Sequence, residues 1–160
     1  MKFRQVEEKD WKKGDFRMFA QIKPDISYFE QKFQAVFDEV YVDGIGNAKY
    51  AFFVTDNNRY FVVDVYASNS VHHSTQIHLL NDIETLADDL EEVLQALDLA
   101  SDDLDWVFES IKFSSYELWR QDDNGHKFLI ETFPCKADAA KAKREFENRH
   151  HKQIYWLEKV

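Results

Sequence analysis

The sequence predicts an α+β fold, an antiparallel sheet covered by amphipathic helices, with a C-terminal ββαβ unit. Two apolar runs joined by Asp56-Asn57-Asn58 indicate a β-hairpin, because Asp and Asn tolerate the left-handed conformations of tight turns. Apolar residues recur at spacings of three and four in 26–40 and in 83–97, which indicates helices with one buried face. The chain has 160 residues, 44% of them hydrophobic, and this is enough for a core of that kind.

The N-terminal part, residues 1–111, is interpreted as one α+β domain with an acidic helix. A short strand is expected at 16–23 and ends at Pro24. Asp25 or Ser27 then caps a helix that runs through Val40. The two hairpin strands are apolar on both faces, so we expect them at the centre of a sheet that is covered on both sides.

A third strand is expected over residues 71–80 of this domain. Its alternating pattern predicts the following inward-facing residues: Val71, His73, Thr75, Ile77 and Leu79.

The most organised stretch is 81–109, which holds eleven Asp and Glu residues and no Lys or Arg. No Lys or Arg occurs between Arg59 and Lys112, so the middle third more than accounts for the net charge of −10. Asn81 and Glu84 have the spacing of a capping box at the start of a helix, and a shorter helix is expected after Ser101.

The acidic helix separates two kinds of side chain around its axis. Its apolar residues fall within an arc of about 120° and predict contact with the core. Glu84, Asp88 and Glu92 lie near the middle of the remaining arc, where like charges at i,i+4 destabilise a helix by about 0.2–0.5 kcal/mol per pair. The uniform sign of the charge favours a role in capturing a basic partner.

The C-terminal part, residues 112–160, is interpreted as a ββαβ unit packed against the first domain. Its pattern is YELWRQDDNGHKFLIETF, an Ala-rich helix, and HKQIYWLE. Over about residues 116–158 this pattern resembles short bacterial proteins of uncharacterised function, and its topology is similar to half of a SPOR-type peptidoglycan-binding repeat. The resemblance implies a ββαβ arrangement and a bacterial or phage origin, and it carries no catalytic residue across. A SPOR protein would need export, and the N-terminus has no secretory signal.

No pattern in the sequence predicts a catalytic residue, a cofactor or a metal site. In one strand, His72 and His78 would be about 20 Å apart and could not share a metal ion. Cys135 is the single cysteine, and no sequence signature supplies a base for it. Gly44-Ile45-Gly46 lacks the third glycine of a dinucleotide-binding loop. The protein is therefore expected not to be an enzyme.

The expected function is that of a cytoplasmic inhibitor or immunity-type protein that binds a basic nucleic-acid enzyme, such as a nuclease toxin or a defence nuclease. The candidate partner-binding residues are Glu84, Asp88, Asp89, Glu91, Glu92, Asp102, Asp103, Asp105 and Trp106, with Trp119 as a further aromatic anchor. Direct nucleic-acid binding and a membrane span are not expected, because the acids repel phosphate and no long apolar run occurs.

Three alternatives to this expectation stay open. One is a hydrolase that uses the histidines, which requires His72 or His78 to line an enclosed pocket. The protein could be a regulatory or scaffold subunit that packs by its helix faces, with the acids serving solubility only. The basic helix near 136–149 could also fold across the acidic face and neutralise it internally.

Overall fold

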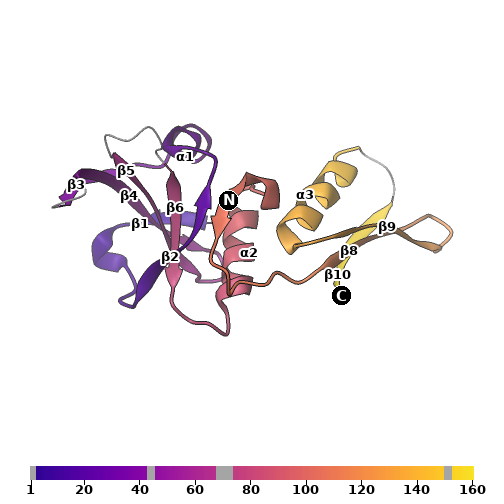
Figure 1. The fold of residues 1–160 in the computed structure, drawn as a ribbon. Coiled ribbons are helices and arrows are strands. Elements are labelled where there is room, and N and C mark those ends of the chain that lie inside the picture. Colours follow the sequence, from indigo (N-terminus) through magenta and orange to yellow (C-terminus); the bar gives the residue numbers. More distant parts are fainter. Residues whose placement is uncertain (1–2, 43–45, 68–73, 150–152) are drawn as a thin grey trace.

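The computed structural model describes residues 3–42, 46–67, 74–149 and 153–160. These residues form two antiparallel sheets and three α-helices, which confirms the α+β class. The large sheet belongs to the N-terminal part and the small sheet to the C-terminal part, and helix α2 (Leu86–Ala96) lies between them (Figure 1). Among the described residues, no helix is long and apolar enough to cross a membrane.

Seven strands make the large sheet, in the order β1-β4-β5-β6-β2-β7, with β3 paired to β4. They are β1 (Phe3–Val6), β2 (Phe16–Ile22), β3 (Asp38–Val42), β4 (Gly46–Thr55), β5 (Tyr60–Ala67), β6 (Thr75–Leu80) and β7 (Leu104–Val107). The predicted hairpin is confirmed as β4–β5, and it lies at the centre of the sheet.

One face of the large sheet carries the main core. Phe53, Phe61 and Leu79 lie in register across β4, β5 and β6, and each is at most 1% exposed. They pack with the buried residues of α2 and with Phe29 of α1 (Ile26–Phe33). Of the predicted inward residues of the third strand, Thr75, Ile77 and Leu79 are buried, whereas Val71 and His73 lie outside the described residues.

The opposite face of the large sheet carries no α-helix of the described residues, yet Val54 and Asp64 are buried on it, so the prediction of a sheet covered on both sides holds only in part. Phe52, Val62 and His78 share this face and are only half-buried. The 3-10 helix η1 (Glu8–Asp10) precedes Trp11, whose ring lies 4.5 Å from Phe16 and 4.6 Å from Phe52 and so shields one corner.

The first helix is shorter than predicted. Asp25 caps it by accepting a hydrogen bond from the Ser27 amide, and Gln34 ends it in the left-handed conformation (φ 56°). Residues 38–42, in part predicted as helix, form β3 instead, because their backbone groups pair with β4. Val36 and Val40, which belong to the apolar stripe of the expected helix 26–40, are 68% and 41% exposed, because Val36 lies beyond the end of α1 and Val40 lies in β3.

The region after the acidic helix also differs from prediction. The sequence predicts a second helix after Ser101, but the chain forms the 3-10 turn η2 (Ser101–Asp103) and then β7. The spacing of Leu104, Val107 and Phe108 fits a helix, but pairing with β2 satisfies the backbone groups of both strands and decides the structure. The capping box of Asn81 and Glu84 does not form, because α2 begins only at Leu86.

The predicted ββαβ unit is confirmed in its order of elements. It consists of β8 (Tyr116–Gln121), β9 (Lys127–Phe133), α3 (Lys136–Glu147) and β10 (Ile154–Lys159). The strand order is β10-β8-β9, and α3 covers one face of this small sheet (Figure 1). Leu118 of β8 is fully buried beneath it.

The β4–β5 turn gives a test of the hairpin. Asn58 has φ 62°, and a β-branched residue there meets a steric cost of about 1–2 kcal/mol. Asn58→Val should lower the free energy of unfolding by about that amount in urea denaturation. Asn58→Gly is the matched control and should leave it within about 0.5 kcal/mol of the original value. Equal stability of the two variants would contradict the turn geometry.

Candidate functional site

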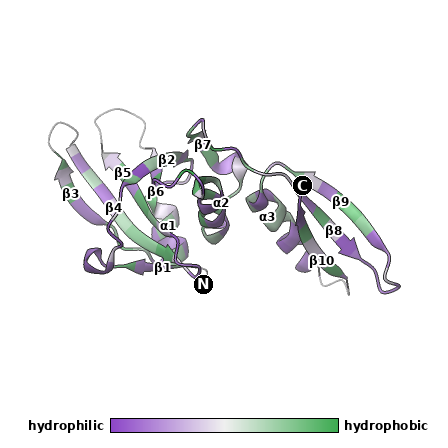
Figure 2. Cartoon of the chain, turned by 90° about the horizontal axis from the view of Figure 1, so that it is seen from below, coloured by the Kyte–Doolittle hydropathy of each residue, from purple (hydrophilic) through white to green (hydrophobic). Residues whose placement is uncertain are grey.

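The nine predicted partner-binding residues divide between the surface and the interior. Exposed are Glu84, Asp88, Asp102, Asp105 and Trp106; half-buried are Glu92 and Asp103; buried are Asp89 and Glu91. The structure therefore does not bring them together on one face. The division follows from the position of α2, which contacts the large sheet on one side and α3 on another (Figure 2).

Glu91 holds the N-terminus of α3. This residue is only 2% exposed, and its Oε1 accepts a hydrogen bond of 3.2 Å from the Lys136 amide. The first amides of a helix have no partner within the helix, and the side chain of Cys135 at the cap position supplies none. Glu91 therefore acts as a cap contributed by another helix. Burial raises the pKa of Glu91, although the Lys136 amide opposes this change.

Asp138 makes the reciprocal contact from α3. It lies in the first turn of α3 and accepts hydrogen bonds from the Ser101 amide (2.7 Å) and the Ser101 hydroxyl (2.6 Å). The two units thus bind each other through two carboxylates that point in opposite directions. Small side chains allow this approach, since Ala137 and Ala139 of α3 are fully buried.

Asp98 adds an ion-pair network at the far end of α2. Its carboxylate lies 2.7 Å from Lys32 Nζ and 2.5 Å from Arg144. Burial would raise the pKa of Asp98, but the hydrogen bond from Lys32 and the charge of Arg144 outweigh burial and lower it. The carboxylate connects α1, α2 and α3.

Two further acids of α2 bind the β4–β5 turn. Asp89 Oδ1 lies 3.0 Å from Arg59 Nε, and Oδ2 accepts a hydrogen bond of 3.0 Å from the Thr85 hydroxyl. Glu92 accepts a hydrogen bond from the Thr55 hydroxyl. Burial raises the pKa of Asp89, against the effects of Thr85 and Arg59.

These contacts correct the prediction of an unmixed acidic arc facing solvent. Asp89 and Glu91 are inside the molecule, and Glu92 is engaged with the hairpin. The helix near 136–149 does pack against α2, and its Arg144 pairs with Asp98, which agrees in part with the alternative of internal neutralisation; Glu84 and Asp88 nevertheless stay exposed. The periodicity of a helix shows in which direction each side chain points, but it does not show that a second helix packs beside the first.

Three of the five exposed residues, Asp102, Asp105 and Trp106, lie at one edge of the large sheet, whereas Glu84 and Asp88 lie at the start of α2. β7 is an edge strand, and the register with β2 passes from Leu104 to Trp106 without a partner for Asp105. Such a bulge is frequent at sheet edges and redirects side chains. Asp102 and Asp105 are exposed, and Trp106 is 40% exposed. Lys23 Nζ binds the main-chain carbonyl of Asp102 and not its carboxylate.

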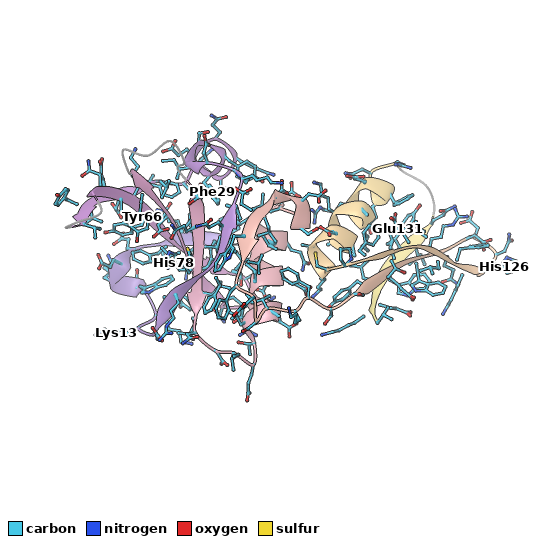
Figure 3. All side chains as sticks on the ribbon, in the orientation of Figure 1. Lys13, Phe29, Tyr66, His78, His126 and Glu131 are labelled. Atoms are coloured by element: carbon cyan, nitrogen blue, oxygen red, sulfur yellow. The ribbon has the colours of Figure 1, made fainter. Side chains whose placement is uncertain are left out.

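Sequence reasoning missed a buried polar cluster on the open face of the large sheet. Asp64 of β5 is 7% exposed, and its Oδ2 lies 3.1 Å from His78 Nε2 on β6. Tyr66, two residues further along β5, forms a side-chain hydrogen bond with Asp64; burial, and then the Asp64 charge, raise the pKa of Tyr66. Figure 3 shows Tyr66 and His78 on these neighbouring strands. A charged residue inside the apolar run FVVDVYA was the signal for this cluster.

The described residues hold no arrangement that suggests a metal site or an activated nucleophile. No group of three or more His, Cys, Asp or Glu side chains within them could hold a metal ion. Cys135 is fully buried, and burial raises the pKa of its thiol to about 11, far from the thiolate that nucleophilic chemistry needs. His72 lies outside the described residues.

An open groove lies where α3 meets the N-terminal part. Its volume is about 530 Å³, and Phe3 and Phe33 contribute apolar lining. Side chains of both charges also line it, namely Lys141, Arg144, Asp98 and Glu145. The groove therefore does not select a ligand by charge.

Glu91 permits a test that separates its charge from its hydrogen bond. Glu91→Ala leaves the Lys136 amide without its side-chain acceptor and should lower the free energy of unfolding by about 1–3 kcal/mol. Glu91→Gln keeps an acceptor oxygen and removes the buried charge. Because the folded-state pKa of Glu91 is raised, the folded chain binds more protons than the unfolded chain between the two pKa values. The stability of the original protein relative to Glu91→Gln should therefore fall as the pH rises through that window.

Urea denaturation of the three proteins between about pH 4 and pH 8 measures this difference. Asp88→Asn serves as the control, because it removes one carboxylate charge from an exposed position of the same helix. If Glu91→Gln and Asp88→Asn gave the same pH dependence, the buried position of Glu91 would be contradicted.

Comparison of the chain with protein-family models, with curated proteins and with solved structures finds no match. The geometry of the described residues is therefore the basis on which a function is proposed.

Proposed function

We propose that the protein is a non-enzymatic inhibitor or immunity-type protein that captures a basic nucleic-acid enzyme. The proposed contact is the acidic edge formed by Asp102, Asp105 and Trp106, which replaces the helical face expected from the sequence. The proposed location is the cytoplasm, because a chain with a single cysteine suits a reducing compartment.

The observation that carries the proposal is an exposed tryptophan beside exposed carboxylates at a bulge in an edge strand. Carboxylates concentrated in this way attract a cationic protein and raise its association rate. A partly exposed tryptophan supplies the apolar anchor around which tight interfaces form. A nuclease site built to receive phosphates offers both the positive charge and the aromatic contacts that fit this edge.

The acids elsewhere on the N-terminal part strengthen the field at longer range. Glu84 and Asp88 are exposed, although Lys159 Nζ, 4.0 Å from the Asp88 carboxylate, offsets part of the Asp88 charge. The alternative of a scaffold subunit that binds by helix packing receives less support. Its main helix, α2, already contacts the large sheet and α3.

The test is a salt-dependent binding and inhibition assay with a panel of purified cationic ribonucleases and deoxyribonucleases. We expect inhibition of at least one enzyme, with an association rate that falls at least about tenfold between about 50 and 300 mM salt. Asp102→Lys/Asp105→Lys should reduce the association rate at least about tenfold, since it reverses the charge at the contact.

Glu30→Lys/Glu131→Lys is the matched control, because both residues are exposed and the change in net charge is the same. It should reduce the rate by less than about threefold. Equal losses in the two variants would show that net charge alone acts and would contradict the proposed edge. Failure to bind any enzyme of the panel at low salt would contradict the proposed function.

A further inference from the structure

One face of the small sheet carries no helix of the described residues, and it is called the free face here. Its other face is covered by α3, where Tyr116 and Tyr155 are 9% and 7% exposed and Phe146 stacks on Tyr155 at 5.7 Å. Alternation along the strands directs a second set of side chains away from α3. These are Glu117, Trp119 and Gln121 of β8, Ile154, Trp156 and Glu158 of β10, and Lys127 and Leu129 of β9.

Two stacked tryptophans occupy the centre of this free face. Trp119 and Trp156 are direct neighbours on β8 and β10, with ring centroids 6.3 Å apart and planes inclined by 16°. Leu129 continues the row on β9 and is 46% exposed, and Ile154 is 65% exposed. An exposed apolar patch of this kind is typical of an interaction surface.

The tryptophan rings offer apolar area and not hydrogen-bond donors. Trp119 Nε1 donates to Glu117 at 2.9 Å, and Trp156 Nε1 donates to Glu158 at 2.7 Å. Both indole donors are therefore satisfied within the chain. A partner that packs by shape and apolar contact fits this face better than a ligand that must be recognised by hydrogen bonds.

The charges on the face are separated along the strand direction. Lys127 lies at the end where β9 pairs with Gln121, and its Nζ reaches back to 5.5 Å from the centre of the Trp156 ring. Glu117 and Glu158 pair with each other at the opposite end, and the tryptophans lie between. A two-fold axis that runs parallel to the sheet and perpendicular to the strands exchanges the two ends, so that the cation of one copy meets the carboxylates of another.

We propose that this face binds a second copy of the chain and forms a symmetric dimer through the tryptophans. Three strands of about six residues span about 20 Å by 14 Å, which gives the free face a flat area of about 300 Å² per copy. That is about 600 Å² in total, below the roughly 1,200 Å² of standard specific interfaces, so a weak dimer that forms only at high protein concentration is expected. Nucleic acid is a poorer occupant, because phosphates would approach Glu117 and Glu158.

Sedimentation equilibrium between about 1 and 500 μM measures the dimer directly. The original protein should pass from monomer to dimer over this range. Trp119→Glu should raise the dissociation constant at least about tenfold, because it places a charge at the centre of the contact. Tyr41→Ser, which changes a 70% exposed aromatic residue of the large sheet, should leave it unchanged.

Trp119→Glu could weaken the dimer only because the variant folds less well, so a second test exchanges the charges of two surface residues instead. Lys127→Glu and Glu158→Lys should each weaken the dimer, and the double variant should be at least about threefold tighter than either single variant. A monomer at every concentration would overturn the proposal. A dimer insensitive to Trp119→Glu, or a double variant no tighter than the singles, would also overturn it.

Discussion

The hydrogen bond from the Lys136 amide to Glu91 is the interaction on which the arrangement of the two units depends. It caps a helix that has no cap of its own, and it uses a carboxylate from a different helix to do so. In the opposite direction, Asp138 of α3 accepts a hydrogen bond from the Ser101 amide. Each unit therefore has a backbone amide whose acceptor is a carboxylate of the other unit. Neither unit satisfies these groups alone, and this explains why a short ββαβ unit packs against the first part through α2.

The same constraint divides the acids of the middle third into two groups. Those near α3 and the β4–β5 turn, such as Glu91 and Asp89, are structural and bear the cost of burial as raised pKa values. Those at the sheet edge, such as Asp102 and Asp105, stay at the surface. The uninterrupted acidic stretch of the sequence is therefore divided between structural and surface positions, and only the surface carboxylates are available to a partner.

The elements defined by local pattern could be predicted, and those defined by distant pairing could not. The β4–β5 hairpin and the ββαβ order follow from turn residues and periodicity, and the buried leucines of α2 follow from phase. By contrast, Leu104–Val107 has a spacing that suits a helix, and only the open edge of β2 makes it a strand. Likewise, nothing near Glu91 in the sequence indicates an amide 45 residues away. Of the candidate site, Trp106 with its flanking acids could be found from composition, whereas its bulge depends on the register with β2.

Hydrogen exchange of the Lys136 amide, followed by NMR, tests the central claim most directly. This amide begins α3 and has Glu91 as its acceptor, so its protection reports on the joint and not on the helix. We expect exchange at least about tenfold slower than in an unstructured chain, and loss of that protection in Glu91→Ala while amides in the middle of α3 stay protected. Exchange of Lys136 at the unstructured rate in the original protein would contradict the account.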